Sequence, residues 1–260
     1  MADTLLVTRQ GAVTTLTINR PEVRNALDDT VSMAMLQALQ AAEDDGTRCI
    51  VITGAGGHFS SGLDIKKAFS TGLTPERVGQ TLGQYFGPTL KAIRASSWPV
   101  IAAVDGYAAG IGCDFALACD LRLVSERGKF AELFIRRGLI PDGGATYLLP
   151  RLVGLGRAME IMFTGRDVEA DEAYRIGLAN QVYPVEGFME RVAAYAEAIA
   201  KQSPQALKRG KAAMLAALNG TFDEALAREA AYQLEIFQTQ DGLEGFAAFM
   251  EKREPVWTGR

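Results

Sequence analysis

One supersecondary unit recurs in this sequence: an apolar strand that runs into a glycine-containing turn and then into a helix. The first copy begins at Cys49 and the second at Val100, a spacing of roughly fifty residues. In both copies the glycines come directly after the predicted strand, at the turn where the chain must reverse. The repeat favours an α/β architecture, and a chain of 260 residues is long enough to bury a sizeable core.

The remaining elements follow from hydrophobic spacing and turn residues. Apolar residues recur at helical spacing from Asp28 to Glu43, which predicts an amphipathic helix. Residues 70–83 are rich in glycine, threonine and other polar types and are predicted to form a mobile connection, either a plain surface loop or a lid over a pocket. The other predicted elements are a hairpin of strands 5–9 and 13–18, strands 48–53, 100–104 and 121–124, and helices near 62–69, 89–94 and 113–119.

The sequence after Pro150 is dominated by helix-forming residues, with one β-like segment at 180–185. Phe188 and the apolar residues that follow it share a helical face, Ser203-Pro204 starts another helix, and Thr221 to Glu224 form a capping box that opens a third. These helices have more apolar surface than a small bundle can bury. We expect self-association, with burial against the chain's own core as the alternative.

Charge and hydropathy exclude several classes of protein. The 27 basic and 31 acidic residues give a net charge of −4, without a basic stripe that could follow a phosphate backbone, so no nucleic acid partner is expected. No apolar run approaches the ~18 residues of a membrane span, and the first ten residues lack the pattern of a signal peptide. We expect a cytoplasmic protein that does not bind membranes.

The scarce residues narrow the chemistry. The three cysteines have no C-x-x-C spacing, and His58 is the only histidine, so neither a metal site nor a serine or cysteine triad is supported. Thr53 to Gly57 follows a strand but departs from the G-x-G-x-x-G pattern at Phe59, which leaves a dinucleotide site as a distant alternative. Any chemistry must rely on carboxylates and backbone amides.

Two glycine-containing turns are predicted to expose backbone N–H groups that could bind a ligand. Ser60 to Asp64 and Ala109 to Cys113 each follow a strand and open a predicted helix, where unpaired N–H groups can bind an anion. Two such amides that converge would form an oxyanion hole. Asp142 lies in a Pro-Asp-Gly turn, while Asp64 and Asp114 lie in first helical turns, so each of these aspartates also has a purely structural explanation.

Five ordered motifs together resemble the enoyl-CoA hydratase/isomerase, or crotonase, superfamily. The resemblance implies a spiral of β-β-α units over residues 1–195, followed by a helical trimerisation region over 196–260, in a homotrimer or a dimer of trimers. The motifs are residues 16–20 with Pro21, Asn25-Ala26-Leu27, Phe59 to Ile65, Ala103 to Gly112, and Gly138 to Gly144, and the resemblance continues to Thr258-Gly259.

The resemblance also implies a site. A coenzyme A thioester would place its carbonyl between the backbone amides of Leu63 and Ile111. Ser61 and Gly62 would form the rim that holds the coenzyme A end, with Arg24 near the adenine or phosphates and Asp64 among the substrate-binding residues. Coenzyme A enters as part of the substrate, so no separate cofactor and no metal are expected.

The acidic residues bear on the reaction. Hydratases of this superfamily carry two glutamates, and the corresponding positions here hold Asp114 and Phe134. Asp142 instead matches the aspartate of phenylacetate-pathway isomerases, and the same region also resembles 4-chlorobenzoyl-CoA dehalogenases. We expect an acyl-CoA isomerase with Asp142 as the base. The alternatives are a hydratase that uses Asp114, alone or with Asp142, and an acyl-CoA-binding subunit without activity.

Overall fold

The structure is a computed structural model, which describes residues 3–72 and 74–260 of the chain. Its larger sheet has the strand order β1-β2-β3-β4-β6-β9, and all neighbours after β2 are parallel. The predicted hairpin is confirmed, because β1 and β2 pair antiparallel from Leu5↔Ile18 to Gln10↔Val13. The strands of this sheet are β1 (Leu5–Gln10), β2 (Val13–Ile18), β3 (Cys49–Gly54), β4 (Val100–Val104), β6 (Leu121–Ser125) and β9 (Gln181–Tyr183).

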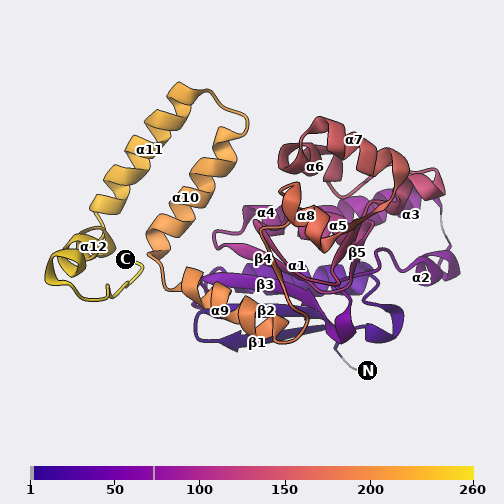
Figure 1. Cartoon of the computed structure of the whole chain (residues 1–260), viewed down its shortest axis with the longest axis horizontal. Helices are drawn as coiled ribbons and strands as arrows, with labels where there is room; N and C mark the ends of the chain where they lie inside the picture. Colours follow the sequence, from indigo (N-terminus) through magenta and orange to yellow (C-terminus); the bar gives the residue numbers. More distant parts are fainter. Residues whose placement is uncertain (1–2, 73) are drawn as a thin grey trace.

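The two faces of this sheet are covered by different helices, as Figure 1 shows. In β3, Ile50 and Ile52 belong to the main core, whereas Cys49 and Val51 belong to a second cluster with Val192. Alternation of side chains along a strand produces this division. Helix α1 (Asp29–Ala41), capped by Asp28 as its sequence predicts, packs on the first face, and α9 (Phe188–Ala200) packs on the other.

A smaller sheet completes the repeated unit. Its strands β5 (Tyr107–Ala109), β7 (Lys129–Ala131) and β8 (Asp167–Glu169) are arranged in that order. The copy that begins at Cys49 has β3, an isolated bridge of Ser60 to Ala108 of β5, and α2 (Ile65–Ser70). The copy that begins at Val100 sends β4 to the larger sheet and β5 to the smaller one before α5 (Ile111–Ala118). A further copy follows with β6, β7 and, after η4 (Leu133–Arg137), α6 (Ala145–Val153). This is the predicted spiral of β-β-α units.

The predicted loop over 70–83 is helical in the part that the structure describes, so the loop is wrong, while its mobility and its role as a lid stay predictions; residue 73 lies outside the described residues. After α2 (Ile65–Ser70), the chain forms α3 (Pro75–Gln80), the π-helical segment η3 (Thr81–Phe86) and α4 (Gly87–Ala95). The Thr74 side chain caps α3 by accepting a hydrogen bond from the Arg77 amide. Phe86 is buried edge-on against Phe115, which anchors this region to the core.

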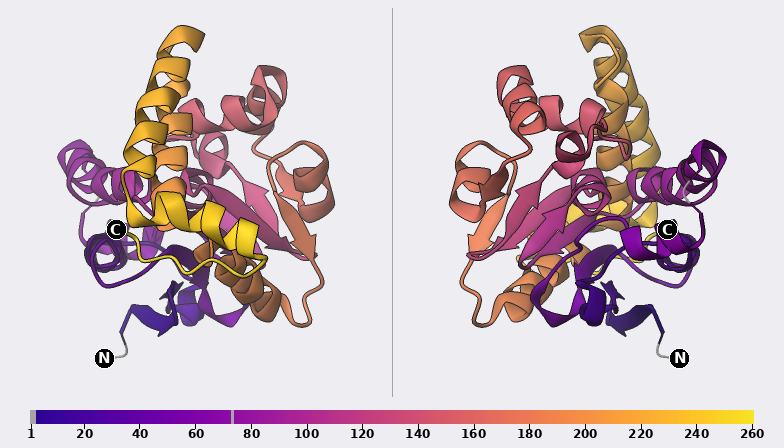
Figure 2. Two further views of the ribbon diagram at one scale, coloured as in Figure 1. Left: turned by 90° about the vertical axis from the view of Figure 1, so that its left-hand side faces the viewer. Right: turned by 90° about the vertical axis from the view of Figure 1, so that its right-hand side faces the viewer.

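The C-terminal helices extend away from the larger sheet, as Figures 1 and 2 show. Ser203 caps α10 (Pro204–Ala217) and the Thr221–Glu224 capping box opens α11 (Phe222–Phe237), both as predicted. The predicted division between residues 195 and 196 falls inside α9, and the domain boundary stays a prediction. The remaining elements are η1 (Pro21–Val23), η2 (Ala55–Gly57), α7 (Leu155–Thr164), α8 (Ala170–Arg175) and α12 (Gln240–Glu251).

None of the helices within the described residues combines the length and the apolar character that a membrane span requires.

Candidate active site

Backbone pairing brings the two glycine turns together. The Ser60 amide donates to the Tyr107 carbonyl at 2.8 Å, and the Ala109 amide donates to the Ser60 carbonyl at 2.9 Å. Gly62 lies so close to this pairing that a Cβ there would be 2.7 Å from the Ala109 carbonyl oxygen, and its φ of +91° is one that L residues rarely adopt. Glycine is therefore required at this position for the turns to approach each other.

The same pairing determines where the Leu63 amide points. Leu27 forms a parallel bridge with Leu63, in which the Leu27 amide donates to Gly62 at 2.7 Å and the Leu27 carbonyl accepts from Asp64 at 2.8 Å. In a parallel bridge the facing residue's own N–H points away from its partner. Leu63 therefore directs its amide away from Leu27, and no acceptor for it occurs among the described residues.

The Ile111 amide is the first of α5. The N-terminal amides of a helix have no partner within the helix, and Gly110, with φ +52° and ψ −130°, turns the chain directly before it. The Gly110 amide donates to the Ala131 carbonyl at 2.8 Å, which ties the start of α5 to β7. No acceptor for the Ile111 amide is found in residues 3–72 or 74–260.

Leu63, Ile111 and Asp142 line one cavity of about 90 Å³. Asp142 is the only residue with a carboxyl side chain among those that line it. Partial burial raises the pKa of this carboxyl above its ordinary value, although the side chain remains accessible to solvent. The other lining residues are Ser61, Gly62, Ile65, Leu82, Phe86, Gly110, Leu133, Phe134, Arg137 and Leu139.

Asp114 does not reach this cavity. Its side chain is completely buried, and its Oδ1 accepts a hydrogen bond from the Ala145 amide at 2.8 Å. A Cβ on Gly143 would lie 2.5 Å from the Asp114 Cβ, so the turn that carries Asp142 rests directly on Asp114. Burial, reinforced by the charge of Glu132, raises the Asp114 pKa well above its usual range. Asp114 thus fixes the Asp142 turn and the start of α6.

Glu132 is a third carboxyl group near this turn, and the sequence interpretation missed it. It is 1% exposed, and neither carboxyl oxygen has a hydrogen-bond partner among the described residues. Burial and, more weakly, the charge of Asp142 raise its pKa to about 7, against the opposing effect of the Cys113 thiol. Glu132 lines a separate, largely apolar cavity of about 220 Å³ with Pro141 and Ala145, behind the Asp142 turn.

The residues predicted for the rim have different environments. The Ser61 amide donates to the Arg24 carbonyl at 2.9 Å, while the Arg24 side chain lies outside the cavity that contains Leu63 and Ile111. Asp64 accepts from Arg20 at 2.7 Å and caps α2 through the Lys67 amide at 3.0 Å. Burial opposes ionisation of Asp64, but these partners outweigh it and lower its pKa.

His58 is also outside the cavity. Its side chain is half-buried beside Gly106, whose position would place a Cβ 3.0 Å from the imidazole Nδ1. The cavity that Leu63, Ile111 and Asp142 line has no histidine among the described residues of its wall.

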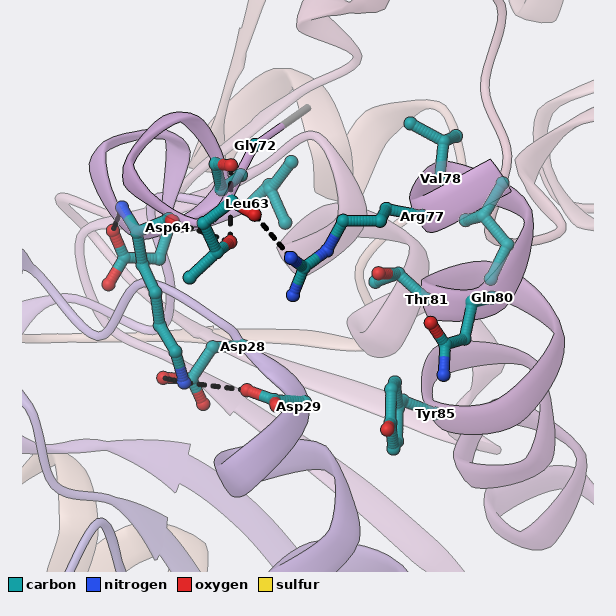
Figure 3. Close-up of a pocket in the computed structure, with 14 residues that line it drawn as sticks. Asp28, Asp29, Leu63, Asp64, Gly72, Arg77, Val78, Gln80, Thr81 and Tyr85 are labelled. Atoms are coloured by element: carbon teal, nitrogen blue, oxygen red, sulfur yellow. Dashed lines mark hydrogen bonds and ion pairs between the residues drawn. The ribbon is translucent and has the colours of Figure 1, made fainter. Parts of the chain in front are cut away.

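A second cavity of about 190 Å³ adjoins the first and shares Leu63 and Leu82 with it. Figure 3 shows its walls. Lys67 contacts Asp28 Oδ2 at 3.0 Å and Asp29 Oδ1 at 2.6 Å, on the side formed by α1 and α2. Arg77 enters from α3 and donates to the Thr71 carbonyl.

The chain is similar to proteins with acyl-CoA activities over its whole length. It is 39% identical to a probable enoyl-CoA hydratase of Rhodobacter capsulatus over 245 residues, which cover 94% of each chain. It is 35% identical to the 1,2-epoxyphenylacetyl-CoA isomerase of Escherichia coli over 263 residues, which cover all of both chains. The relatives therefore include proteins named as hydratases and a protein named as an isomerase.

Solved structures and the family model agree with this relationship. An enoyl-CoA hydratase from Bacillus anthracis superimposes with a TM-score of 0.95 at 33% identity and covers 99% of this chain and 100% of its own. The family model described as enoyl-CoA hydratase/isomerase matches residues 8–260. The spiral fold and these matches together show that the chain belongs to the enoyl-CoA hydratase/isomerase family, within the crotonase superfamily.

Proposed function

We propose that this enzyme is an acyl-CoA isomerase that works through a thioester enolate. The observation that supports this most directly is the single cavity shared by Leu63, Ile111 and Asp142. The two backbone amides would donate to the thioester carbonyl oxygen, which gains negative charge as a proton leaves the neighbouring carbon. Each such donor contributes about 10²- to 10³-fold to the rate.

Asp142 would move the proton. As a carboxylate it takes a proton from one carbon of the acyl chain, and as a carboxylic acid it returns that proton to another carbon, so that a double bond shifts without net change in composition. One base is sufficient for this reaction, and its raised pKa makes the carboxyl a better proton acceptor at neutral pH. A ring epoxide could be rearranged through the same enolate, as the name of the E. coli relative suggests.

The rim and the substrate follow from the same proposal. Ser61 and Gly62 would hold the coenzyme A end, with Arg24 beside its phosphates, and Asp64 would support the turn through its ion pair with Arg20. Coenzyme A would enter as part of the substrate.

Asp142→Asn tests the proposal. We expect the variant to lose about 10²- to 10⁴-fold in kcat with a 3-enoyl-CoA, because the amide cannot accept the proton. Asp171→Asn, at an exposed position on α8, is the matched control and should retain wild-type turnover. Undiminished turnover by Asp142→Asn would remove Asp142 from the mechanism.

Hydration of a 2-enoyl-CoA is the second candidate, because several relatives are named as hydratases. Asp142 would then position the water, since Asp114 and Glu132 lie behind its turn and do not line the cavity. Incubation with crotonyl-CoA distinguishes the two reactions. Loss of the absorbance of the conjugated double bond, with formation of the 3-hydroxy product, would favour hydration.

We also propose that the protein is a homotrimer or a dimer of trimers in the cytoplasm. Large apolar side chains on the C-terminal helices support assembly, since Met214 is 76%, Phe222 77% and Phe249 79% exposed in the single chain. Burying such a surface against other copies is favourable.

A further inference from the structure

The cavity of Figure 3 has an unusual wall for a site that adjoins an acyl-CoA carbonyl. Most of its residues are polar or charged, although its two shared residues, Leu63 and Leu82, are apolar. A saturated hydrocarbon tail would remove water from these polar groups without replacing their hydrogen bonds, which is unfavourable. The wall is therefore suited to an acyl group that is polar at its far end.

The charged side chains that line this cavity differ in whether they form ion pairs. Lys67 pairs with Asp28 and Asp29, and Asp64 pairs with Arg20 at 2.7 Å. Arg77, in contrast, has no carboxylate within ion-pair distance among the described residues, and its protein acceptor is the Thr71 carbonyl. An arginine has five N–H donors in a fixed plane, so several remain available for a ligand.

The placement of Arg77 matters as much as its charge. Figure 3 shows the guanidinium of Arg77 reaching from α3 toward Leu63 and Gly72, with Asp29 on the α1 side of the cavity. Asp29 is paired there with Lys67. Two cations, Lys67 and Arg20, pair with the three aspartates that line this cavity, which reduces but does not cancel the repulsion of an anion bound at Arg77. The guanidinium thus faces the space next to the proposed carbonyl site.

We propose that this cavity receives the far end of the acyl group and that Arg77 selects thioesters whose acyl chain ends in a second carboxylate. The planar fork of arginine matches the two oxygens of a carboxylate. The inference rests on one part of the proposed function, the binding of the thioester carbonyl at Leu63, because only that placement directs the acyl chain of the substrate into this cavity. A coenzyme A phosphate offers similar chemistry, but the rim residues Ser61 and Gly62 do not line this cavity.

Equilibrium binding tests the proposal independently of turnover. The affinities of the full-length protein for adipyl-CoA and hexanoyl-CoA, which have six-carbon acyl groups with and without the second carboxylate, are measured by calorimetry. The wild type should favour adipyl-CoA by about 10- to 100-fold, the range for hydrogen bonds to a charged group. Arg77→Met should reduce this ratio to near one, and Arg77→Lys should retain part of it.

Lys66→Met is the matched control, because Lys66 is an exposed cation on α2 that does not line the cavity. It should leave the ratio unchanged. Equal loss of both affinities in Arg77→Met would assign Arg77 to the coenzyme A phosphates, and an unchanged ratio would assign it no role; either result overturns the proposal. If the protein binds adipyl-CoA selectively but does not isomerise a 3-enoyl-CoA, the proposed isomerase function is overturned and the proposed carboxylate site at Arg77 is still supported.

Discussion

At the scale of residues, three carboxyl groups near one turn differ in their environments. Asp142 lines the cavity of the two amides, Asp114 is bonded to the Ala145 amide, and Glu132 is buried without a partner among the described residues. The sequence resemblance identified Asp142 and Asp114 but not Glu132, because burial of a polar residue depends on tertiary packing and is only weakly indicated by the local sequence. Its place directly after a short strand, two residues before Phe134, was the available indication.

Glu132 makes stability depend on pH in an unusual direction. Its pKa is raised from 4.5 to about 7 in the folded protein, so between these pH values the native state holds a proton that the unfolded state releases. Stability therefore falls as pH rises from about 4.5 to about 7 and stays at the lower level above that. The full effect is about 3 kcal/mol at 1.4 kcal/mol for each pH unit.

Glu132→Gln should remove this dependence, and urea unfolding at pH 5 and pH 8 measures it. We expect the variant to gain up to about 3 kcal/mol relative to wild type on going from pH 5 to pH 8. Glu126→Gln, at an exposed turn, should show no such gain. Parallel pH profiles for wild type and Glu132→Gln would mean that Glu132 ionises normally in the folded protein.

At the scale of elements, turn geometry was more predictable than the helices that follow it. The glycine turns, the capping box and most strands were predicted because their conformation depends mainly on residues that are close together in the sequence. The α3–η3 region was missed because its glycines and polar residues obscure a helical pattern whose anchor, Phe86, is buried against the distant Phe115. Gly79 and Gly83 face open space in this region, so neither glycine is required there by close packing against another element.

Gly62→Ala tests whether close approach of the turns is required for activity. The new Cβ would meet the Ala109 carbonyl at 2.7 Å and demand an unfavourable φ, so the Leu63 amide must shift. A displacement of about 1 Å can reduce activity by about 10²-fold. We expect such a loss in kcat/KM, with a loss of about 1–2 kcal/mol in the free energy of unfolding.

Gly79→Ala is the control for this substitution. It lies within α3 with no atom within 4 Å of the new Cβ, so it should retain activity and gain up to about 1 kcal/mol in stability. Wild-type activity in Gly62→Ala would show that the approach of the two turns does not position the amides.

At the scale of the whole molecule, the spiral fold and the helical end could be predicted from the repeat and the family motifs. The way in which the C-terminal helices extend from the core could not, because their apolar faces would suit either burial within the chain or contact with another copy. The structure leaves these faces exposed, with Phe222 and Phe249 among the most accessible apolar residues.

Sedimentation equilibrium tests the proposed assembly. The wild type should have three or six times the 28.0 kDa mass of the chain, and Phe249→Glu should lower this mass by placing a charge in an apolar contact. Val185→Thr, at an apolar position outside α10–α12, should assemble normally. A wild-type protein that sediments at the mass of one chain would contradict the assembly.

The position of the thioester oxygen is the most direct measurement of the proposed mechanism. A crystal structure of the Asp142→Asn variant with a bound 3-enoyl-CoA should place that oxygen about 2.7–3.1 Å from both the Leu63 and Ile111 nitrogens. The substituted side chain of the variant should lie beside the carbon that loses its proton. An oxygen that contacts only one of these nitrogens, or that binds elsewhere, would contradict the mechanism.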